Sequence, residues 1–205
     1  MTPQKFENIT SYQRSIVIRT ILGDGYLYKD RRLQVEQSLQ HQAYLKWLHA
    51  QLTTISGTIS YVERTHPKNG KISKSCRFFT KKVFQDLQNV FYAEIHGKKT
   101  KIIPKNLEQL LDPIVLAVWF MDDGGKAQNT PKGAYINATS FTHQERVQIQ
   151  QVFQNVFNLK ITIQKAGGNK QYNFYIPANS YTQFYTLVSP TVLLVPTMMY
   201  KLAQS

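Results

Sequence analysis

The chain has 205 residues, of which 42% are apolar, so it can bury a hydrophobic core. Its longest nearly unbroken apolar stretch, 113–121, is too short to cross a membrane, because a membrane-spanning helix needs about 20 residues. A formal net charge of +13 favours a polyanionic partner. The single cysteine excludes an intramolecular disulfide and a CxxC zinc site, and favours a reducing, intracellular location.

The first half of the chain is predicted to contain helices and paired strands in alternation. An apolar-periodic run from Ser11, the expected N-cap, to Leu22 predicts a helix that ends at Gly23-Asp24-Gly25. The next expected elements are strands at 26–28 and 33–38, a helix at 41–52, strands at 58–65 and 71–80, a helix at 81–93 and a basic link to residue 107.

The second half repeats this order. An apolar helix at 114–121 ends at Asp123-Gly124-Gly125, and a strand pair follows around the turn 130–133. Thr142 and Glu145 have the spacing of a capping box, which predicts the start of a helix. Strands at 160–164 and 171–176 and a last helix near 179–188 complete the half.

Further echoes between the halves predict a tandem duplication. The segment SLQHQ at 38–42 reappears as SFTHQ at 140–144. Lys101 follows Asp24 by 77 positions, and Lys201 follows Asp123 by 78. We therefore expect one active site on a pseudo-twofold axis, with one carboxylate from each half.

The two aspartates stand where acids are electrostatically unfavourable, because the C-terminal end of a helix already carries partial negative charge. Acidic residues are also scarce in the second half of the chain: residues 111–205 hold only four, Asp112, Asp122, Asp123 and Glu145. Carboxylate and free carbonyl oxygens suit a hard divalent cation such as Mg²⁺, which can support phosphodiester hydrolysis. The alternative is that the aspartates only end helices or serve turns.

The predicted strands have one apolar and one polar face, which is typical of antiparallel sheets packed on helices. Their polar positions carry amides, hydroxyls and arginines, which suit hydrogen bonding to base edges; an ordinary solvated face is the alternative. The candidate nucleic-acid contacts are Arg32, Gln34, Glu36, Ser60, Arg64, Lys71 and Arg77 in the first half, and Tyr135, Asn137, Thr162, Gln164, Gln171, Asn173 and Tyr175 in the second.

The segments VIRTILGDG (17–25) and LAVWFMDDG (116–124) resemble the paired motifs of LAGLIDADG homing endonucleases, in the single-chain, two-motif form. The segments KIIP (101–104) and VPTMMYKL (195–202) and the order of elements extend the resemblance over nearly the whole chain. It implies an α+β fold with an αββαββα unit in each half, 1–110 and 111–205. The motif helices would pack at the pseudo-twofold interface, and two antiparallel sheets would form a saddle over duplex DNA.

The resemblance also implies roles for individual residues. Asp24 and Asp123 would bind the metal, with backbone carbonyls from Gly23 and Asp122. Lys101 and Lys201 would polarise solvent or stabilise the phosphorane, and Gln37 and Thr139 would order water. The implied cofactor is Mg²⁺; Mn²⁺ would substitute for it, and Ca²⁺ would support binding without turnover.

Two departures from the family pattern bear on geometry. The third motif position is small in the family but is Arg19 and Val118 here, which implies looser helix packing or an Arg19 that points away from the interface. Gln37 shares strand parity with apolar Leu33 and Val35, so it would need a β-bulge to reach the site, and Ser38 is the alternative.

The function expected from these observations is a site-specific double-strand DNA endonuclease of the intron or intein type, acting as a monomer on a long asymmetric target. The alternative is an RNA maturase or intron-splicing factor, with intron RNA as partner, or a DNA-binding regulator on the same fold. No membrane role is expected, and the expected location is intracellular, in a mitochondrion or chloroplast. The chain has no Gly-rich phosphate loop and no histidine pair at ligand spacing.

Overall fold

The computed structural model describes residues 9–203 except 24, 29, 129 and 169. The chain divides by its internal contacts into two compact units, Met1–Ile102 and Ile103–Ser205. The boundary thus lies before the expected one after residue 110. The intervening segment belongs with the second unit, because Pro104 O accepts from Gln148 Nε2 (3.1 Å) and Glu108 Oε1 from Asn155 Nδ2 (2.6 Å).

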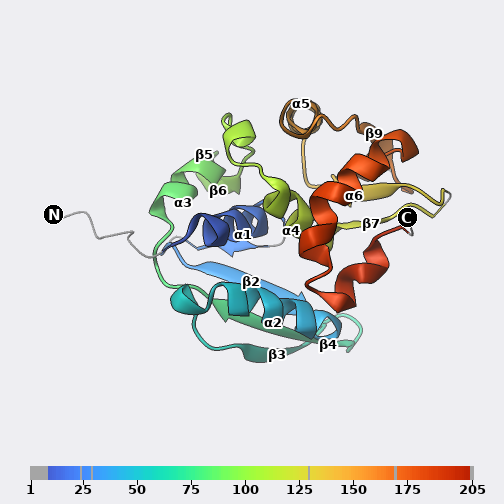
Figure 1. Cartoon of the computed structure of the whole chain (residues 1–205). Coiled ribbons are helices and arrows are strands. Elements are labelled where there is room, and N and C mark those ends of the chain that lie inside the picture. Colours follow the sequence, from blue (N-terminus) through green and yellow to red (C-terminus); the bar gives the residue numbers. More distant parts are fainter. Residues whose placement is uncertain (1–8, 24, 29, 129, 169, 204–205) are drawn as a thin grey trace. The chain divides into compact units, whose positions relative to one another are not determined.

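The first unit has a four-stranded antiparallel sheet in the order β1-β2-β4-β3. Helix α2 covers the face of this sheet that carries Leu33, Val35 and Phe78 (Figure 1), and His49 of α2 lies edge-on to Phe78 with ring centroids 5.1 Å apart. The elements are α1 (Ser11–Leu22), β1 (Tyr26–Leu27), β2 (Leu33–Ser38), η1 (Leu39–His41), α2 (Gln42–Gln51), η2 (Thr53–Ile55), β3 (Ser60–Thr65), β4 (Ile72–Phe79), α3 (Gln85–Phe91), β5 (Tyr92–Ile95) and β6 (Lys98–Lys101).

The second unit has the same topology, with a sheet in the order β7-β8-β10-β9. Its elements are η3 (Leu107–Gln109), α4 (Pro113–Asp123), β7 (Gly124–Lys126), β8 (Ala134–Asn137), α5 (His143–Phe157), β9 (Thr162–Lys165), β10 (Tyr172–Ile176), α6 (Ala178–Val192) and η4 (Pro196–Lys201). The predicted α+β fold with an αββαββα order in each half is confirmed, and the shared strand order is what a duplication requires.

Aromatic side chains fill the core of the second unit. The Trp119 ring of α4 lies 5.8 Å from Phe153, 5.9 Å from Phe141 and 6.1 Å from Phe174, all edge-on. Helix α4 also packs on α6, where Phe120 meets Phe184 edge-on at 5.1 Å. These contacts bury α4 from Val115 to Met121, which explains why its sequence is apolar on every side.

Local capping sets where two helices begin. The predicted capping box at Thr142 is confirmed: Thr142 Oγ1 accepts from Glu145 N (3.2 Å) while Thr142 N donates to Glu145 Oε2 (2.8 Å). The predicted N-cap of α1 was wrong by one residue. Thr10 is the cap, because Gln13 N donates to its hydroxyl (3.1 Å) and Gln13 Oε1 accepts from its backbone N–H (3.2 Å).

The predicted helix at 81–93 and basic link to residue 107 needs correction. Helix α3 ends at Phe91, and the next ten residues form the antiparallel hairpin β5–β6. Its two-residue turn, His96-Gly97, has positive φ at both positions (50° and 72°), as the turns favoured in tight hairpins require. This hairpin positions Lys101.

Arg19 is fully buried and its guanidinium lies against Gly23, near the end of the same helix. A Cβ at Gly23 would lie 2.7 Å from Arg19 Nη2, so any larger residue there would require the Arg19 guanidinium to move. In the second unit the equivalent Val118 is also fully buried. No helix in the described part of the chain is long and apolar enough to cross a membrane.

Candidate functional site

In each unit a lysine holds the end of the motif helix. Lys101 Nζ donates to Gly23 O (3.0 Å) and Gly25 O (3.3 Å) at the end of α1. Lys201 Nζ donates to Asp122 O (3.0 Å) and to Met121 O at the end of α4. The last carbonyls of a helix lack partners within the helix and carry partial negative charge, so an ammonium group is favourable at both places.

This arrangement brings the predicted lysines to the predicted carbonyls. Gly23 and Asp122 are equivalent, since each precedes the motif aspartate, and each carbonyl accepts from its unit's lysine. Of the predicted carboxylates, Asp123 is the half-buried last residue of α4, whereas Asp24 lies outside the described residues.

The chemistry of this donor set fits a hard divalent cation. Carbonyl and carboxylate oxygens are the ligands that Mg²⁺ and Ca²⁺ take, and neither needs a cluster of histidines or cysteines. Among the residues that the structure describes, no three His, Cys, Asp or Glu side chains gather into a metal site. A site here would therefore combine carboxylates with backbone carbonyls.

Gln37 lies on the helix-covered face of the first sheet. The pairing of β2 with β4 runs without interruption from Gln34↔Phe79 to Ser38↔Ser75, so the bulge we expected is absent from this strand pair. Gln37 therefore keeps the side of Leu33 and Val35, and Ser38 lies on the opposite, open face. Without a bulge Gln37 does not reach the open face, whereas Ser38, the alternative, does.

Thr139 follows β8 and its exposed hydroxyl joins the ends of two strands. Thr139 Oγ1 accepts from Tyr172 N (3.2 Å) and donates to Tyr172 O (3.4 Å). The hydroxyl thus closes the β8–β10 ladder and retains one acceptor position. Gln37 and Thr139, predicted to have the same role, differ in both side-chain chemistry and surroundings.

The open face of the first sheet carries the predicted nucleic-acid contacts. Glu36, Arg77 and Ser60 form one row across β2, β4 and β3, because they are direct partners in the ladder. Arg32 and Arg77 flank Phe79, with their guanidinium carbons 5.3 and 5.4 Å from the ring centroid. Lys71 lies apart, in the turn between β3 and β4.

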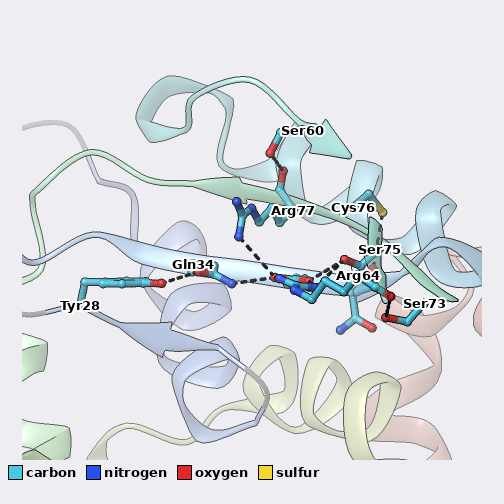
Figure 2. A network of polar contacts seen from close by, with 10 residues as sticks. Tyr28, Gln34, Ser60, Arg64, Ser73, Ser75, Cys76 and Arg77 are labelled. Atoms are coloured by element: carbon cyan, nitrogen blue, oxygen red, sulfur yellow. Dashed lines mark hydrogen bonds and ion pairs between the residues drawn. The ribbon is translucent and has the colours of Figure 1, made fainter. Parts of the chain in front are cut away.

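The polar side chains of this face contact one another (Figure 2). Glu36 accepts from both terminal nitrogens of Arg64, from Ser75 Oγ and from Gln34 Nε2 (2.8 Å), and Arg77 Nη1 lies 3.9 Å from Glu36 Oε2. Hydrogen bonding to Arg64 is the main cause that lowers the pKa of Glu36, against partial desolvation that raises it. Alternation in the sequence predicted which face these residues share but not that Glu36 joins them.

The open face of the second sheet has a different character. Tyr135, Tyr175 and Thr162 form one row across β8, β10 and β9, and Asn137, Asn173 and Gln164 form the next. A hollow of about 580 Å³ on this face is lined by Tyr135, Gln164, Asn173 and Tyr175, together with neighbouring turn residues. Gln171 lies just before β10. The second unit therefore presents amides and aromatic hydroxyls without an acid among them.

Comparisons with known proteins agree with this geometry. The model described as the LAGLIDADG DNA endonuclease family matches residues 14–184. The chain is 33% identical over 193 residues to the cytochrome b mRNA maturase bI2 of Debaryomyces hansenii, covering 89% of this chain and 70% of that protein. The structure of the homing endonuclease I-WcaI bound to its DNA recognition sequence superimposes with a TM-score of 0.83 at 26% identity, covering 100% of this chain and 96% of that one. The structure of I-DmoI in complex with DNA and Mn shares the fold, with a TM-score of 0.50 at 16% identity, covering 87% of this chain and 96% of that one.

Proposed function

From the premise that the chain belongs to the LAGLIDADG DNA endonuclease family, we propose that it is a site-specific, metal-dependent double-strand DNA endonuclease of the homing type. The observation that carries the proposal is the repeated lysine at the end of each acidic motif helix. Two strands must be cut in a duplex, and each unit supplies one such helix end. The protein acts as a monomer.

In this proposal the residues at the two helix ends divide the work by chemistry. Asp24 and Asp123 supply carboxylates, and Gly23 and Asp122 supply carbonyl oxygens. A divalent cation held by these oxygens would supply Lewis-acid activation of water and of the scissile phosphate. We expect Mg²⁺ as the cofactor, with Mn²⁺ substituting and Ca²⁺ supporting binding without turnover.

The lysines, being anchored on backbone carbonyls, hold positive charge where the phosphate would gain negative charge. The hydroxyl of Thr139 orients water in the second unit, and in the first unit Ser38, which lies on the open face, takes this role in place of Gln37. Because these two groups differ, the two strands are cut at different rates. Nicked duplex should therefore accumulate during the reaction.

The two open sheet faces bind the DNA. The first carries Arg32, Arg64 and Arg77 together with Glu36, in a half of the chain that is itself basic, and it reads bases with arginines and an amide. The second reads bases with amides and tyrosines around its hollow. Since the faces differ, the target is long and asymmetric.

A second candidate function is intron RNA maturation, because a relative 33% identical to this chain is named a cytochrome b mRNA maturase. In that case the same two sheet faces would bind intron RNA, and the acidic helix ends would have no hydrolytic role. That relative's name and the intracellular expectation from the single cysteine support an organelle as the location.

Selection of cleaved sites from a randomised duplex library with Mg²⁺ tests the proposal. We expect one long asymmetric target that the wild type cuts on both strands, and no cutting by Asp123→Asn. Glu94→Gln is the matched control, because it neutralises an exposed carboxylate on β5. Cutting in excess chelator would refute the metal assignment. Failure of the wild type to cut any duplex would leave the maturase or regulator function.

A further inference from the structure

Glu36 is the centre of a polar network on the open face of the first sheet. In Figure 2 the network extends from Tyr28 through Gln34 to Arg64 and Ser75, which come from different strands. The Glu36 side chain is 20% exposed, whereas that of Arg64 is 50% exposed. Glu36 is therefore less accessible to solvent than Arg64, which donates hydrogen bonds to it.

The carboxylate of Glu36 has no acceptor position left for a base. A carboxylate offers about four lone-pair sites. Four donors occupy them: Arg64 Nη1 and Ser75 Oγ at Oε1, and Arg64 Nη2 (3.1 Å) and Gln34 Nε2 (2.8 Å) at Oε2. Cytosine N4 would need one of these sites, so Glu36 does not read cytosine in this arrangement.

Glu36 also determines which way the Gln34 amide points. An ionised carboxylate only accepts, so Gln34 must turn its NH₂ group toward Glu36. The opposite end is held as well, because Tyr28 OH donates to Gln34 Oε1 (2.8 Å). The amide keeps one N–H and one oxygen lone pair, the combination that pairs with N7 and N6 of adenine.

Arg64 is occupied by the same carboxylate. Both of its terminal nitrogens donate to Glu36, and Nη1 also lies 3.2 Å from Ser75 Oγ. Two-point recognition of guanine, or of a phosphate, through Nη1 and Nη2 requires that end of the guanidinium to be open. While Glu36 is ionised and paired, Arg64 therefore offers the DNA only its side edge, formed by Nε and Nη2.

We propose that Glu36 is a positioning residue for sequence recognition, which fixes the Gln34 amide in the orientation that selects adenine and withholds the terminal Nη1–Nη2 fork of Arg64 from the DNA. The inference rests on the proposed function of this sheet face in binding duplex DNA. It implies that Glu36 lowers affinity for DNA in general, through its negative charge and the withheld arginine, and raises discrimination at one base pair.

Two variants separate these effects. Glu36→Gln keeps the shape but frees the Gln34 amide to rotate and releases Arg64. Tyr28→Phe keeps every charge and removes only the donor to Gln34 Oε1. Glu63→Gln is the matched control, since it neutralises a half-exposed carboxylate on the opposite side of the same sheet.

The measurement is the equilibrium dissociation constant, with Ca²⁺, for the wild-type target and for all single base-pair changes in it. We expect the wild type to prefer adenine at one position by roughly tenfold or more, as a two-point amide contact provides. Both Glu36→Gln and Tyr28→Phe should reduce that preference to within about threefold at the same position. Glu36→Gln alone should steepen the log–log salt slope by about 0.9, because Arg64 gains a phosphate. A purely structural role would weaken all duplexes alike.

The outcomes are decisive. Unchanged preferences in Glu36→Gln, or losses at different positions in the two variants, would overturn the inference while the wild-type target still supports the proposed function. A wild type without any preferred duplex would overturn both. If Glu36→Gln does not fold by circular dichroism, Tyr28→Phe carries the test alone, and full retention of the adenine preference in it refutes the inference.

Discussion

Replacement of Lys201 by methionine should destabilise the second unit as well as slow cleavage. The Lys201 side chain is buried, and its ammonium donates to two carbonyls at the end of α4. Methionine fills similar space but donates nothing, so Met121 O and Asp122 O each lose the hydrogen bond from the ammonium. The variant therefore tests whether the lysine holds the helix end together.

The size of the effect follows from these contacts. A hydrogen bond to a charged group contributes about 1.5–3 kcal/mol, and a cation at a helix C-terminus up to about 2 kcal/mol. The ammonium no longer has to be buried in the variant, which offsets part of that sum. We expect a net loss of about 2 kcal/mol in the free energy of unfolding, or about 4–8 °C in Tm for a protein of this size. Lys101→Met should lose about half as much, since Lys101 is more exposed.

Urea unfolding of the two variants measures this directly, with Lys160→Met as the control because Lys160 is exposed. Cleavage of the selected target is then followed at a temperature where every variant is folded. We expect both lysine variants to cut more slowly than wild type, to unequal degrees, with nicked duplex accumulating. The reasoning is refuted if Lys201→Met unfolds at the same urea concentration as Lys160→Met.

Four further predictions concern other parts of the molecule. Asp24→Asn and Asp123→Asn should each abolish double-strand cleavage while the dissociation constant stays within about tenfold, since each removes a negative ligand but keeps the volume; cutting by the double variant at the wild-type rate would contradict this. Binding should weaken with salt at a log–log slope of about −0.9 per phosphate contact, and a slope near zero would argue against DNA binding. Thr142→Ala should cost about 1 kcal/mol in urea unfolding, because α5 loses its capping box; an unchanged midpoint would refute that role. The lowered pKa of Glu36 means that its ionised form stabilises the fold above its unfolded pKa of about 4.3, and that this stability is lost as pH falls through the folded value. The difference in stability between wild type and Glu36→Gln should therefore be constant from neutral pH to about 5 and shrink below about 4.

Local signals in the sequence were sufficient for the αββαββα order of each half and for the duplication, but not for the β5–β6 hairpin. A capping box such as Thr142–Glu145 is formed by residues three apart, and strand alternation such as that of Leu33 and Val35 depends on a single strand. The two motifs that contain Asp24 and Asp123 can likewise be recognised without the tertiary structure, because the similarity between them is visible in the sequence. These features act over a few residues, so patterns of hydrophobicity and turn residues predict them.

The tertiary structure decided what those residues contact. Lys101 reaches Gly23 O across 78 positions of sequence, through a hairpin whose strands are too polar to show an apolar alternation. Similarly, Glu36 meets Arg64 only because β4 lies between their strands and brings both to one face. Such partners depend on strand order and register, which arise when the whole unit packs. The sequence by itself therefore determined the fold and the candidate residues, whereas packing determined the lysine-held helix ends and the network around Glu36.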